Sequence, residues 1–566
     1  MGQQQSFDLT YVKGKGWANN DIILHAPDAA TFGGPAGFGP YGGKDTVQAC
    51  FDANPQWAVG SGKEYKCYNG SVLNSGDTAW FVSSAPFLGG LLPLSTRLHI
   101  LSFIFSPTLQ FFPPPSFQLT SSALVLFMSV PGLALYYSGL VRQANVLTTA
   151  MQTLSICCFI TFMWMAFGYS LAFAPTNPYR KTSTPIYGDG SRLWFRGMKY
   201  DTTHFNAPSV PEACYCMYQL TFALITPALI CGSFADRMKY WPMVVFMCLW
   251  HIVVYCPIAH ASWHPDGFLY QAGVLDFAGG NVVHIASGVA GLVSVAIVGN
   301  RRGFNNPLEK ENFSPNNIMT TFTGAMMLWV GWFGFNGCSG GTAGMVAGQA
   351  VLNTHVSACM GGLSWMLIEV IFAPDHLPKF LGMISGVISG LVAITPGAGF
   401  VDQNGALWTG VFAGSMCYFG AQLKHYLGYD DALDAFGVHA IGGIIGGISV
   451  GFFATQHNGG GMPGKFANAP GVNNRDGVYY SNMTHGGHQL AMQIYGIVVS
   501  VFWSAFASAI LLLTIDKVTS LISADGTGLR VSAEHEDTGL DASIHGESLG
   551  PAKIDGLEMV PQTETC

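Results

Sequence analysis

Charged residues are scarce in this 566-residue chain, which has 24 Lys and Arg and 32 Asp and Glu, only 10% of the total. Soluble globular proteins carry about 25% charged residues, so the scarcity argues against a water-exposed fold. No run of five basic residues occurs, and we expect no nucleic-acid partner. The thirteen cysteines contain no pair of C-x2-C motifs, so they predict no zinc site. The first 80 residues lack a usual signal peptide.

Long apolar runs recur between about residues 119 and 518, separated by polar links. A membrane-spanning helix needs roughly 20 apolar residues. Many of the 71 glycines lie inside these runs, where small residues let helices pack closely in a bilayer. We therefore predict an all-α integral membrane protein with a transmembrane domain over residues 119–518. Eleven spans are expected near residues 119–141, 145–174, 209–234, 240–263, 272–299, 316–338, 348–373, 380–399, 404–426, 435–455 and 489–516.

The Lys and Arg residues of the short loops set the expected orientation. They follow spans 1, 3, 5, 7, 9 and 11, whereas the short loops after spans 4, 6 and 8 have none. The rule places the N-terminal segment, residues 1–81, outside the cell and the tail, residues 519–566, in the cytoplasm. We expect a multi-pass protein of the plasma membrane.

Four residues predicted to face outward are candidates for covalent modification. Cys50 and Cys67 lie in the polar N-terminal segment, where they form a disulfide or remain free. Asn69 begins the sequon Asn-Gly-Ser, and Asn482 begins Asn-Met-Thr in the loop after span 10. Glycosylation is predicted at both asparagines.

Residues 82–118 fit the pattern of spans poorly. The run PFLGGLLPLSTRLHILSFIFSPTLQFFPPP is apolar, but prolines and Arg97 interrupt it, and a twelfth span would spoil the charge alternation. Val82-Ser83 can be encoded GTAAGT, a typical intron start, and residues 111–118 can be encoded as a pyrimidine tract ending in CAG, a typical intron end. Removing the segment keeps the reading frame and joins DTAWF to LTSSALVLFMS. We interpret it as a translated intron of a eukaryotic gene; the alternative is an inserted outer loop.

Two histidines lie in apolar spans, where ionisable side chains are costly and mark functional sites. Span 5 contains DFAGGNVVH, with Asp276 and His284, and span 10 begins DAFGVHAIGG, with Asp434 and His439. The spans are equivalent members of two five-helix halves, which an odd helix number makes opposite in orientation. The histidines can therefore meet at the midplane, although a lone membrane histidine can also make a helix-to-helix hydrogen bond. Without a third ligand they make a poor zinc site, so we expect no metal, no cofactor and no enzyme.

Ordered motifs across residues 119–550 resemble the ammonium transporter (Amt/Mep/Rh) family, and its Amt branch most closely. They include ALVLFMSVPGLALYYSGLVRQANVL, MYQLTFALITPALICGSFADR, PIAHASW, LDFAGGNVVHI, GWFGFNGCSG and FGVHAIGGIIGG. The resemblance implies two inverted five-helix repeats plus a C-terminal helix, in a homotrimer with one pore per subunit. It also implies transport of ammonium or ammonia, with methylammonium as an analogue, and a role in nitrogen uptake.

The resemblance assigns five residues to an outer recognition site and gate. Phe222 and Phe335 match the paired aromatic gate, and Phe222, Trp263 and Ser339 match the site that recognises NH4+. Tyr218 matches a neighbouring aromatic position that is often Phe in the family. Aromatic faces attract a desolvated cation, and a hydroxyl accepts one of its N–H groups. Taken singly, each aromatic residue can also be core packing or part of an interfacial belt.

The resemblance places three further residues below that site. Asp276 matches the acidic residue beneath it, and His284 and His439 match the twin histidines of a hydrophobic pore. A narrow apolar pore rejects the intact ion, so the family picture is that neutral NH3 passes the histidines with or without a separate proton. Asp276 can equally be the N-cap of span 5.

The tail sequence LRVSAEHEDTGLDASIHGESL resembles the family's cytoplasmic regulatory segment, which contacts a neighbouring subunit. Gly539, Asp541 and His545 fit that pattern, and Ser543 lies where plant relatives carry a phosphorylatable Thr. A phosphate adds about −1.5 to −2 charge, which we expect to undock the tail. The alternative is a disordered acidic tail, and no cytoplasmic regulator is indicated.

Two functions other than transport remain open on the same fold. One is an ammonium sensor, although the 48-residue tail has no room for a kinase or cyclase domain. The other is a gas channel of the Rh type for NH3 or CO2, against which Trp263 and Ser339 favour the Amt branch.

Overall fold

The computed structural model describes residues 114–174, 184–199, 202–304, 313–341, 343–455, 476–480, 485–549, 553–554 and 557–558. All of them belong to one of the two units into which the chain divides, Asn74–Cys566. The helices are α5 Pro114–Phe127, α6 Leu133–Leu140, α7 Val146–Met163, α8 Tyr169–Phe173, α9 Glu212–Phe234, α10 Tyr240–Trp250, α11 Cys256–Trp263, α12 Phe268–Ala272, α13 Ala286–Val298, α14 Ile318–Gly337, α15 Met345–Phe372, α16 Phe380–Ile394, α17 Gln403–Leu427, α18 Ile441–Phe453, α20 His485–Ile522, α21 Ala533–Thr538 and α22 Leu540–His545.

Short π-helical and 3-10 turns interrupt or join these helices. The π-helical turns are η3 Met128–Gly132, η5 Trp164–Gly168, η7 His251–Tyr255, η8 Gly280–Ile285 and η11 Phe436–Ala440. The 3-10 turns are η4 Gln143–Asn145, η6 Gly190–Phe195 and η10 Cys338–Gly340. Two antiparallel pairs of short strands complete the described part: β1 Thr203–His204 with β2 Ala207–Pro211, and β3 Lys553–Ile554 with β4 Leu557–Glu558.

Each of the eleven segments predicted as spans contains a helix, and nine helical stretches of the described chain are long and apolar enough to cross a membrane. The other two predicted spans are α16, which has 15 residues, and α17, which has 25. The first span begins at Ser116, three residues before the predicted start. The prediction of a helical membrane fold is confirmed, and the count of eleven crossings stays a prediction.

The predicted start of span 5 was wrong. Residues 273–279 are not helical, and the helix begins with η8 at Gly280. Gly273, at φ +94°, ends α12, and Gly279, at φ +120°, directly precedes η8. The apolar pattern continues through this break, so hydropathy alone does not reveal it.

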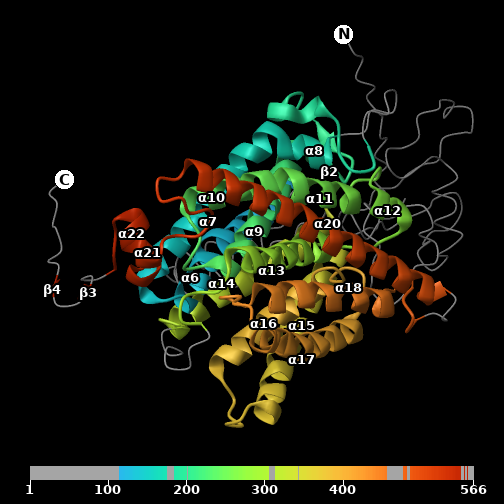
Figure 1. Cartoon of the computed structure of the whole chain (residues 1–566). Helices are drawn as coiled ribbons and strands as arrows, with labels where there is room; N and C mark the ends of the chain where they lie inside the picture. Colours follow the sequence, from blue (N-terminus) through green and yellow to red (C-terminus); the bar gives the residue numbers. More distant parts are fainter. Residues whose placement is uncertain are drawn as a thin grey trace, which may run out of the picture. The chain divides into compact units, whose positions relative to one another are not determined.

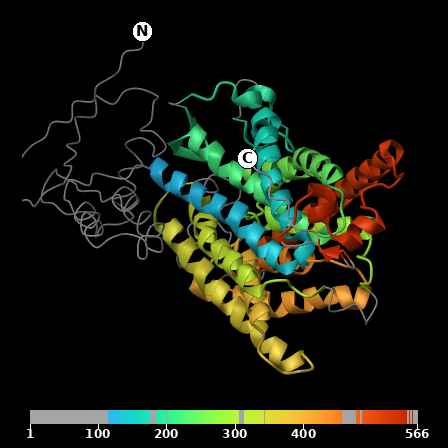
Figure 2. The ribbon, with the colours of Figure 1, turned by 90° about the vertical axis from the view of Figure 1, so that its left-hand side faces the viewer.

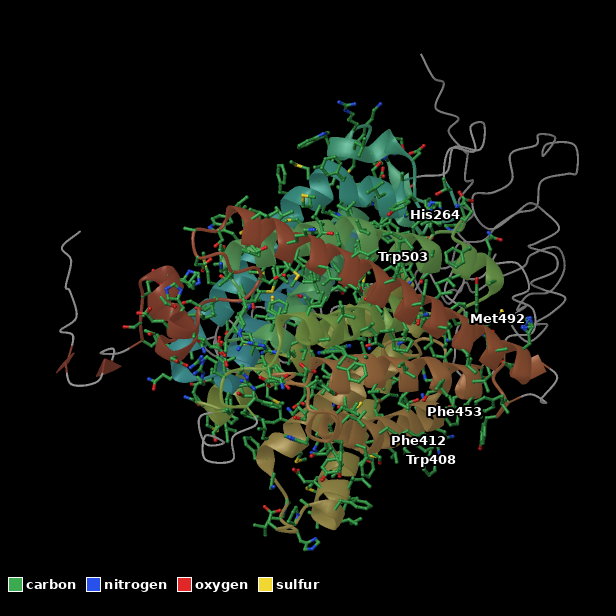
Figure 3. All side chains as sticks on the ribbon, in the orientation of Figure 1. His264, Trp408, Phe412, Phe453, Met492 and Trp503 are labelled. Carbon is green, nitrogen blue, oxygen red and sulfur yellow. The ribbon has the colours of Figure 1, made fainter. Side chains whose placement is uncertain are left out.

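Close helix packing depends on glycine, as expected for a membrane bundle. Helices α15, α16 and α17 contact one another and lie together at the lower edge of Figures 1 and 2. A Cβ on Gly361 of α15 would lie 2.4 Å from the Gly386 carbonyl oxygen of α16. Trp408 and Phe412 of α17, which Figure 3 labels, are about half exposed and can face lipid or another subunit.

Loops with the predicted positive residues lie together at one face of the bundle. Lys239 binds Asp525 at 3.1 Å, Arg302 binds Asp537 at 3.0 Å, and Arg142 donates to the Glu536 carbonyl oxygen at 3.0 Å. The loops after spans 1, 3 and 5 therefore share a side with the tail, as the charge alternation predicts.

Candidate functional site

Four buried aromatic rings from three helices form one cluster. Tyr218 and Phe222 lie on α9, Trp263 ends α11, and Phe335 lies on α14. The ring centroids of Phe222 and Phe335 are 4.1 Å apart, and Trp263 meets Phe222 edge-on at 5.8 Å. Tyr218 meets Phe222 at 5.0 Å. The structure thus brings together the aromatic residues predicted for the gate and the recognition site.

Two hydroxyl groups border this cluster. Tyr218 Oη donates to the carbonyl oxygen of Phe335 at 2.6 Å, and Ser339 Oγ donates to the same oxygen at 2.8 Å. The two hydroxyl oxygens lie 3.3 Å apart. When each hydroxyl gives its single proton to this carbonyl, both oxygens keep lone pairs that can accept N–H groups.

The carboxylate of Asp276 is fully buried and caps the half-helix that follows it. Its two oxygens accept the backbone N–H groups of four residues, Gly279, Gly280, Asn281 and Val282, at 2.7–3.3 Å. Asp276 therefore caps the turn through its side chain, as an N-cap residue would, although the N-cap position itself is Gly279. Its carbonyl oxygen accepts Trp263 Nε1–H at 2.8 Å, which joins the capped segment to the aromatic cluster.

The two predicted histidines meet inside the bundle. His284 Nδ1 and His439 Nδ1 are 3.3 Å apart, and the rings lie 14° from parallel with centroids 5.4 Å apart. Two imidazoles at this distance share one proton, because one nitrogen donates and the other accepts. His284 Nε2 is buried and has no hydrogen-bond partner among the described residues.

A row of rings connects the aromatic cluster with the histidines. Phe335 lies 6.3 Å from His284, and Trp332 stacks on His284 with centroids 5.4 Å apart. Trp332 Nε1–H donates to Thr395 Oγ1 at 2.9 Å, which fixes the indole. Trp332 was not among the predicted site residues, although it lies one helical turn before Phe335 in GWFGFNG.

Both histidines lie in π-helical turns, His284 in η8 and His439 in η11. In η11, the turn that carries His439, the buried aspartate that corresponds to Asp276 is Asp431 rather than Asp434. Asp431 Oδ2 accepts the Phe436 N–H at 2.7 Å, whereas Asp434 is one-third exposed and binds Lys424 at 2.6 Å. Each histidine follows its capping aspartate by eight positions, a spacing in the sequence that could have identified Asp431.

The tail docks against loops of its own chain. The Asp541 carboxylate accepts the N–H groups of Leu147 and Thr148 at 3.0 and 2.7 Å, and so caps α7. The Leu540 N–H donates to Asn145 Oδ1 at 2.7 Å. Ser543 Oγ donates to the Gly539 carbonyl oxygen at 2.7 Å and lines a cavity of about 480 Å³ with Lys239, His535 and His545.

Several predicted features lie outside the described residues. These are the N-terminal segment, residues 82–113 of the suspected intron, the cysteines Cys50 and Cys67, and the sequon residues Asn69 and Asn482.

The model of the Ammonium Transporter Family matches residues 116–549. An ammonium transporter of Bacillus subtilis is 40% identical over 426 residues, which cover 75% of this chain and 95% of the relative. Ammonium transporter 1 of Dictyostelium discoideum is 36% identical, with 76% of this chain and 85% of the relative covered. The crystal structure of Saccharomyces cerevisiae Mep2 matches with a TM-score of 0.65 and 32% identity, over 75% of this chain and 89% of that one. The chain belongs to the ammonium transporter family.

Proposed function

We propose that this chain conducts ammonium across the plasma membrane, recognising NH4+ at the aromatic cluster and passing NH3 along the paired histidines. The observation that carries the proposal is the unbroken row of ring contacts from Trp263 through Phe222 and Phe335 to His284 and His439. The relatives are named as ammonium transporters, which agrees with transport and not with enzymatic catalysis.

Recognition of the cation rests on three kinds of group. An ion that leaves water needs substitutes for its hydration. Each aromatic face supplies up to about 2 kcal/mol of cation–π attraction when desolvated. The Tyr218 and Ser339 hydroxyl oxygens, 3.3 Å apart, accept N–H groups that K+ lacks. The buried Asp276 carboxylate adds a favourable potential below them.

Passage beyond Phe335 favours the neutral molecule. The path there is lined by rings, and the histidines offer nitrogen atoms but no fixed charge. The orphaned Nε2 of His284 can accept from, or donate to, a passing NH3. The shared proton between the two Nδ1 atoms lets the pair relay a proton without either ring moving.

The test is voltage-clamp current in oocytes on adding micromolar ammonium, for the full chain and for the chain without residues 82–118. Saturable current supports electrogenic transport. Uptake of methylammonium without current supports electroneutral NH3 passage. If neither current nor methylammonium uptake is observed although the protein is at the surface, the result contradicts transport and leaves sensing as the function.

Substitutions at two histidines, one at the proposed pore and one exposed in a span, provide matched variants. His284→Leu removes the ring that contacts Phe335 and His439, and we expect uptake to be lost or its pH dependence altered. His355→Leu is the control, because His355 also lies in a span but is exposed on α15. Equal uptake and equal pH dependence in both variants would contradict a pore role for His284.

We also propose that the chain forms a homotrimer with a cytoplasmic tail that regulates transport. The tail contacts the loops that carry the positive residues, which supports its placement in the cytoplasm. Ser543→Asp, which adds charge to the docked α22, is expected to lower transport. Normal transport by this variant, with Ser543→Ala as its control, would argue against regulation at this residue.

A further inference from the structure

The recognition site depends on a piece of unwound backbone inside the bundle. Residues 273–279 separate α12 from η8, and residues 274–279 are buried. Unpaired N–H and C=O groups in a membrane interior are costly, so such a segment persists only where other groups satisfy it. Neighbouring helices supply these partners: Phe277 N–H donates to the Pro396 carbonyl oxygen at 3.0 Å, and Ala278 N–H donates to that of Thr395 at 3.2 Å.

One side chain pairs with both polar groups of Leu275, the residue before Asp276. Gln493 Oε1 accepts the Leu275 N–H at 2.7 Å, and Gln493 Nε2 donates to the Leu275 carbonyl oxygen at 2.8 Å. The amide thus makes the two hydrogen bonds to Leu275 that a neighbouring β-strand would make. Gln493 lies on α20, directly after Met492, which Figure 3 labels, and is 1% exposed.

Gln493 also connects the two halves of the bundle. Its Nε2 lies 3.4 Å from the Gly447 carbonyl oxygen of α18, the helix that continues from the turn with His439. Gln489, one helical turn earlier, donates to Gln493 Oε1 at 3.1 Å and so orients the amide. Helix α20 packs closely against the unwound segment here, as Gly496 shows: a Cβ on this residue would lie 2.7 Å from the Val274 side chain.

We propose that Gln493 is a positioning residue for ammonium recognition. By holding Leu275 it fixes the next residue, Asp276, whose carbonyl oxygen holds the Trp263 indole and whose carboxylate caps the half-helix with His284. The hydrogen bonds of Gln493 described above go to Leu275, Gly447 and Gln489, so we expect it to act through the backbone segment. The transport measurement that tests this inference rests on the proposed function, whereas the structural measurement does not.

The test replaces Gln493 with methionine in the full chain, which keeps the length of the side chain and removes both bonds. We expect the half-saturating ammonium concentration to rise about tenfold, with a smaller change in maximal uptake per molecule at the surface. Ser500→Ala is the matched control, since Ser500 is buried on the same helix and its hydroxyl has no hydrogen-bond partner among the described residues. If Gln493→Met does not reach the surface, Gln493→Glu carries the test, because it keeps the acceptor for the Leu275 N–H.

A double-mutant cycle separates positioning from a general loss of folding. In a Trp263→Phe background, which already lacks the bond to Asp276, Gln493→Met should raise the half-saturating concentration clearly less than in the unmodified chain. Equal effects in both backgrounds would overturn the inference. A structure of Gln493→Met in which residues 275–278 and Trp263 keep their positions would also overturn it, whether or not the chain transports ammonium. Loss of transport by the unmodified chain instead contradicts the proposed function.

Discussion

Tyr218 gives the proposed recognition site a hydroxyl group that a phenylalanine at this position would lack. Its oxygen lies 3.3 Å from Ser339 Oγ, and both hydroxyls donate to the Phe335 carbonyl oxygen. Two acceptors at this spacing suit a cation with several N–H groups better than one acceptor does. We therefore expect the pair to favour ammonium, whose four N–H groups reach both oxygens in any orientation, over methylammonium, whose methyl group leaves fewer such orientations.

Tyr218→Phe tests this assignment. The ring stays, but one acceptor is lost, so the half-saturating concentration should rise by about three- to tenfold, with maximal uptake retained. Methylammonium should lose less affinity than ammonium. The measurement is concentration-dependent uptake of both, with Tyr495→Phe as control because Tyr495 is exposed on α20. Equal losses for both substrates would contradict a discriminating role of the hydroxyl.

Asp431 is the second aspartate that caps a histidine-bearing turn, and it is buried in a loop outside the spans. Burial, and after it the nearby Asp434 carboxylate, raises the pKa of Asp431 to about 6. The folded chain therefore holds this proton up to about pH 6, whereas the unfolded chain releases it near pH 4. The contribution of Asp431 to stability is therefore greatest below about pH 4, falls as the pH rises from about 4 to 6, and then stays level.

The prediction is that Asp431→Asn removes this pH dependence. The amide oxygen still accepts the Phe436 N–H, and no buried charge forms, so the variant should be more stable than the parent at pH 7 by about 2–3 kcal/mol. Unfolding temperatures of the purified protein between pH 4 and pH 8 measure the difference. Asp434→Asn should reduce the parent's pH dependence in part. A constant difference between Asp431→Asn and the parent across this range would refute the assignment.

At this scale the sequence predicted that His284 and His439 meet, as they do, because ionisable residues inside apolar runs stand out. Their role in a pore stays a prediction. The sequence missed Asp431, because Asp434 lies closer to the span and competes with it. It also missed Gln489 and Gln493, which the apolar length of the last span conceals. Their spacing of four residues, continued by the buried Ser500, Ser504 and Ser508, marks one polar face of α20 that a helical plot could have shown.

Among the elements, the helical segments were predictable and their breaks were not. Hydropathy finds a run of about 20 apolar residues whether or not its backbone is continuous. The break before Gly280 depends on partners that are distant in the sequence, such as Gln493 and Pro396. The π-helical turns at His284 and His439 likewise have no known signature in a single sequence.

Docking of the tail depends on the backbone conformation of one residue. Gly539 has φ +100° and ψ 148°, a region almost restricted to glycine, and a Cβ there would lie 2.3 Å from the Ala144 Cβ. Gly539→Ala should therefore release α21 and α22, and with them the Asp541 cap on α7. We expect the exchange of the Leu147 and Thr148 amide hydrogens to become at least about tenfold faster.

Gly546 provides the control for this experiment. It also has a positive φ, +68°, but a Cβ there would meet nothing within 4 Å. Gly546→Ala should cost about 1 kcal/mol locally and leave the Asp541 contacts intact. Equal protection of Leu147 and Thr148 in the two variants would mean that the tail does not depend on the contact between Gly539 and Ala144.

For the whole molecule, the charge alternation predicted that the loops after spans 1, 3 and 5 lie on the same side as the tail, and the tail contacts of Arg142, Lys239 and Arg302 agree with it. Arg301 extends this face inward, where it binds Asp430 at 2.8 Å and Asp236 at 3.1 Å. Asn145 binds both Asp236 and the tail residue Leu540, so the docked tail is joined through hydrogen bonds to the base of the bundle. Which of these residues bind one another could not be predicted from the charges of each loop taken alone.

Residues 82–118 bear on the integrity of the whole chain, and we propose that they are a translated intron. Their last five residues lie in α5, where Gln118 is 1% exposed and neither side-chain amide atom has a hydrogen-bond partner among the described residues. An unpaired buried amide costs about 1–3 kcal/mol. Removal of the segment places Phe81 directly before Leu119, at the position of Gln118, and Trp80 at the position of the buried Phe117. Apolar rings there fit a membrane span better than a glutamine does.

The chain without residues 82–118 should therefore unfold at a higher temperature and reach the surface in larger amounts than the full chain. Gln118→Leu in the full chain should recover part of the gain, about 1–2 kcal/mol, because it removes only the unpaired amide. Gln143→Leu, at an exposed glutamine of the same span's end, should recover none. A mature transcript that keeps the nucleotides for residues 82–118, together with a shortened chain no more stable than the full one, would show that the segment is an inserted outer loop and that Gln118 finds a partner in it.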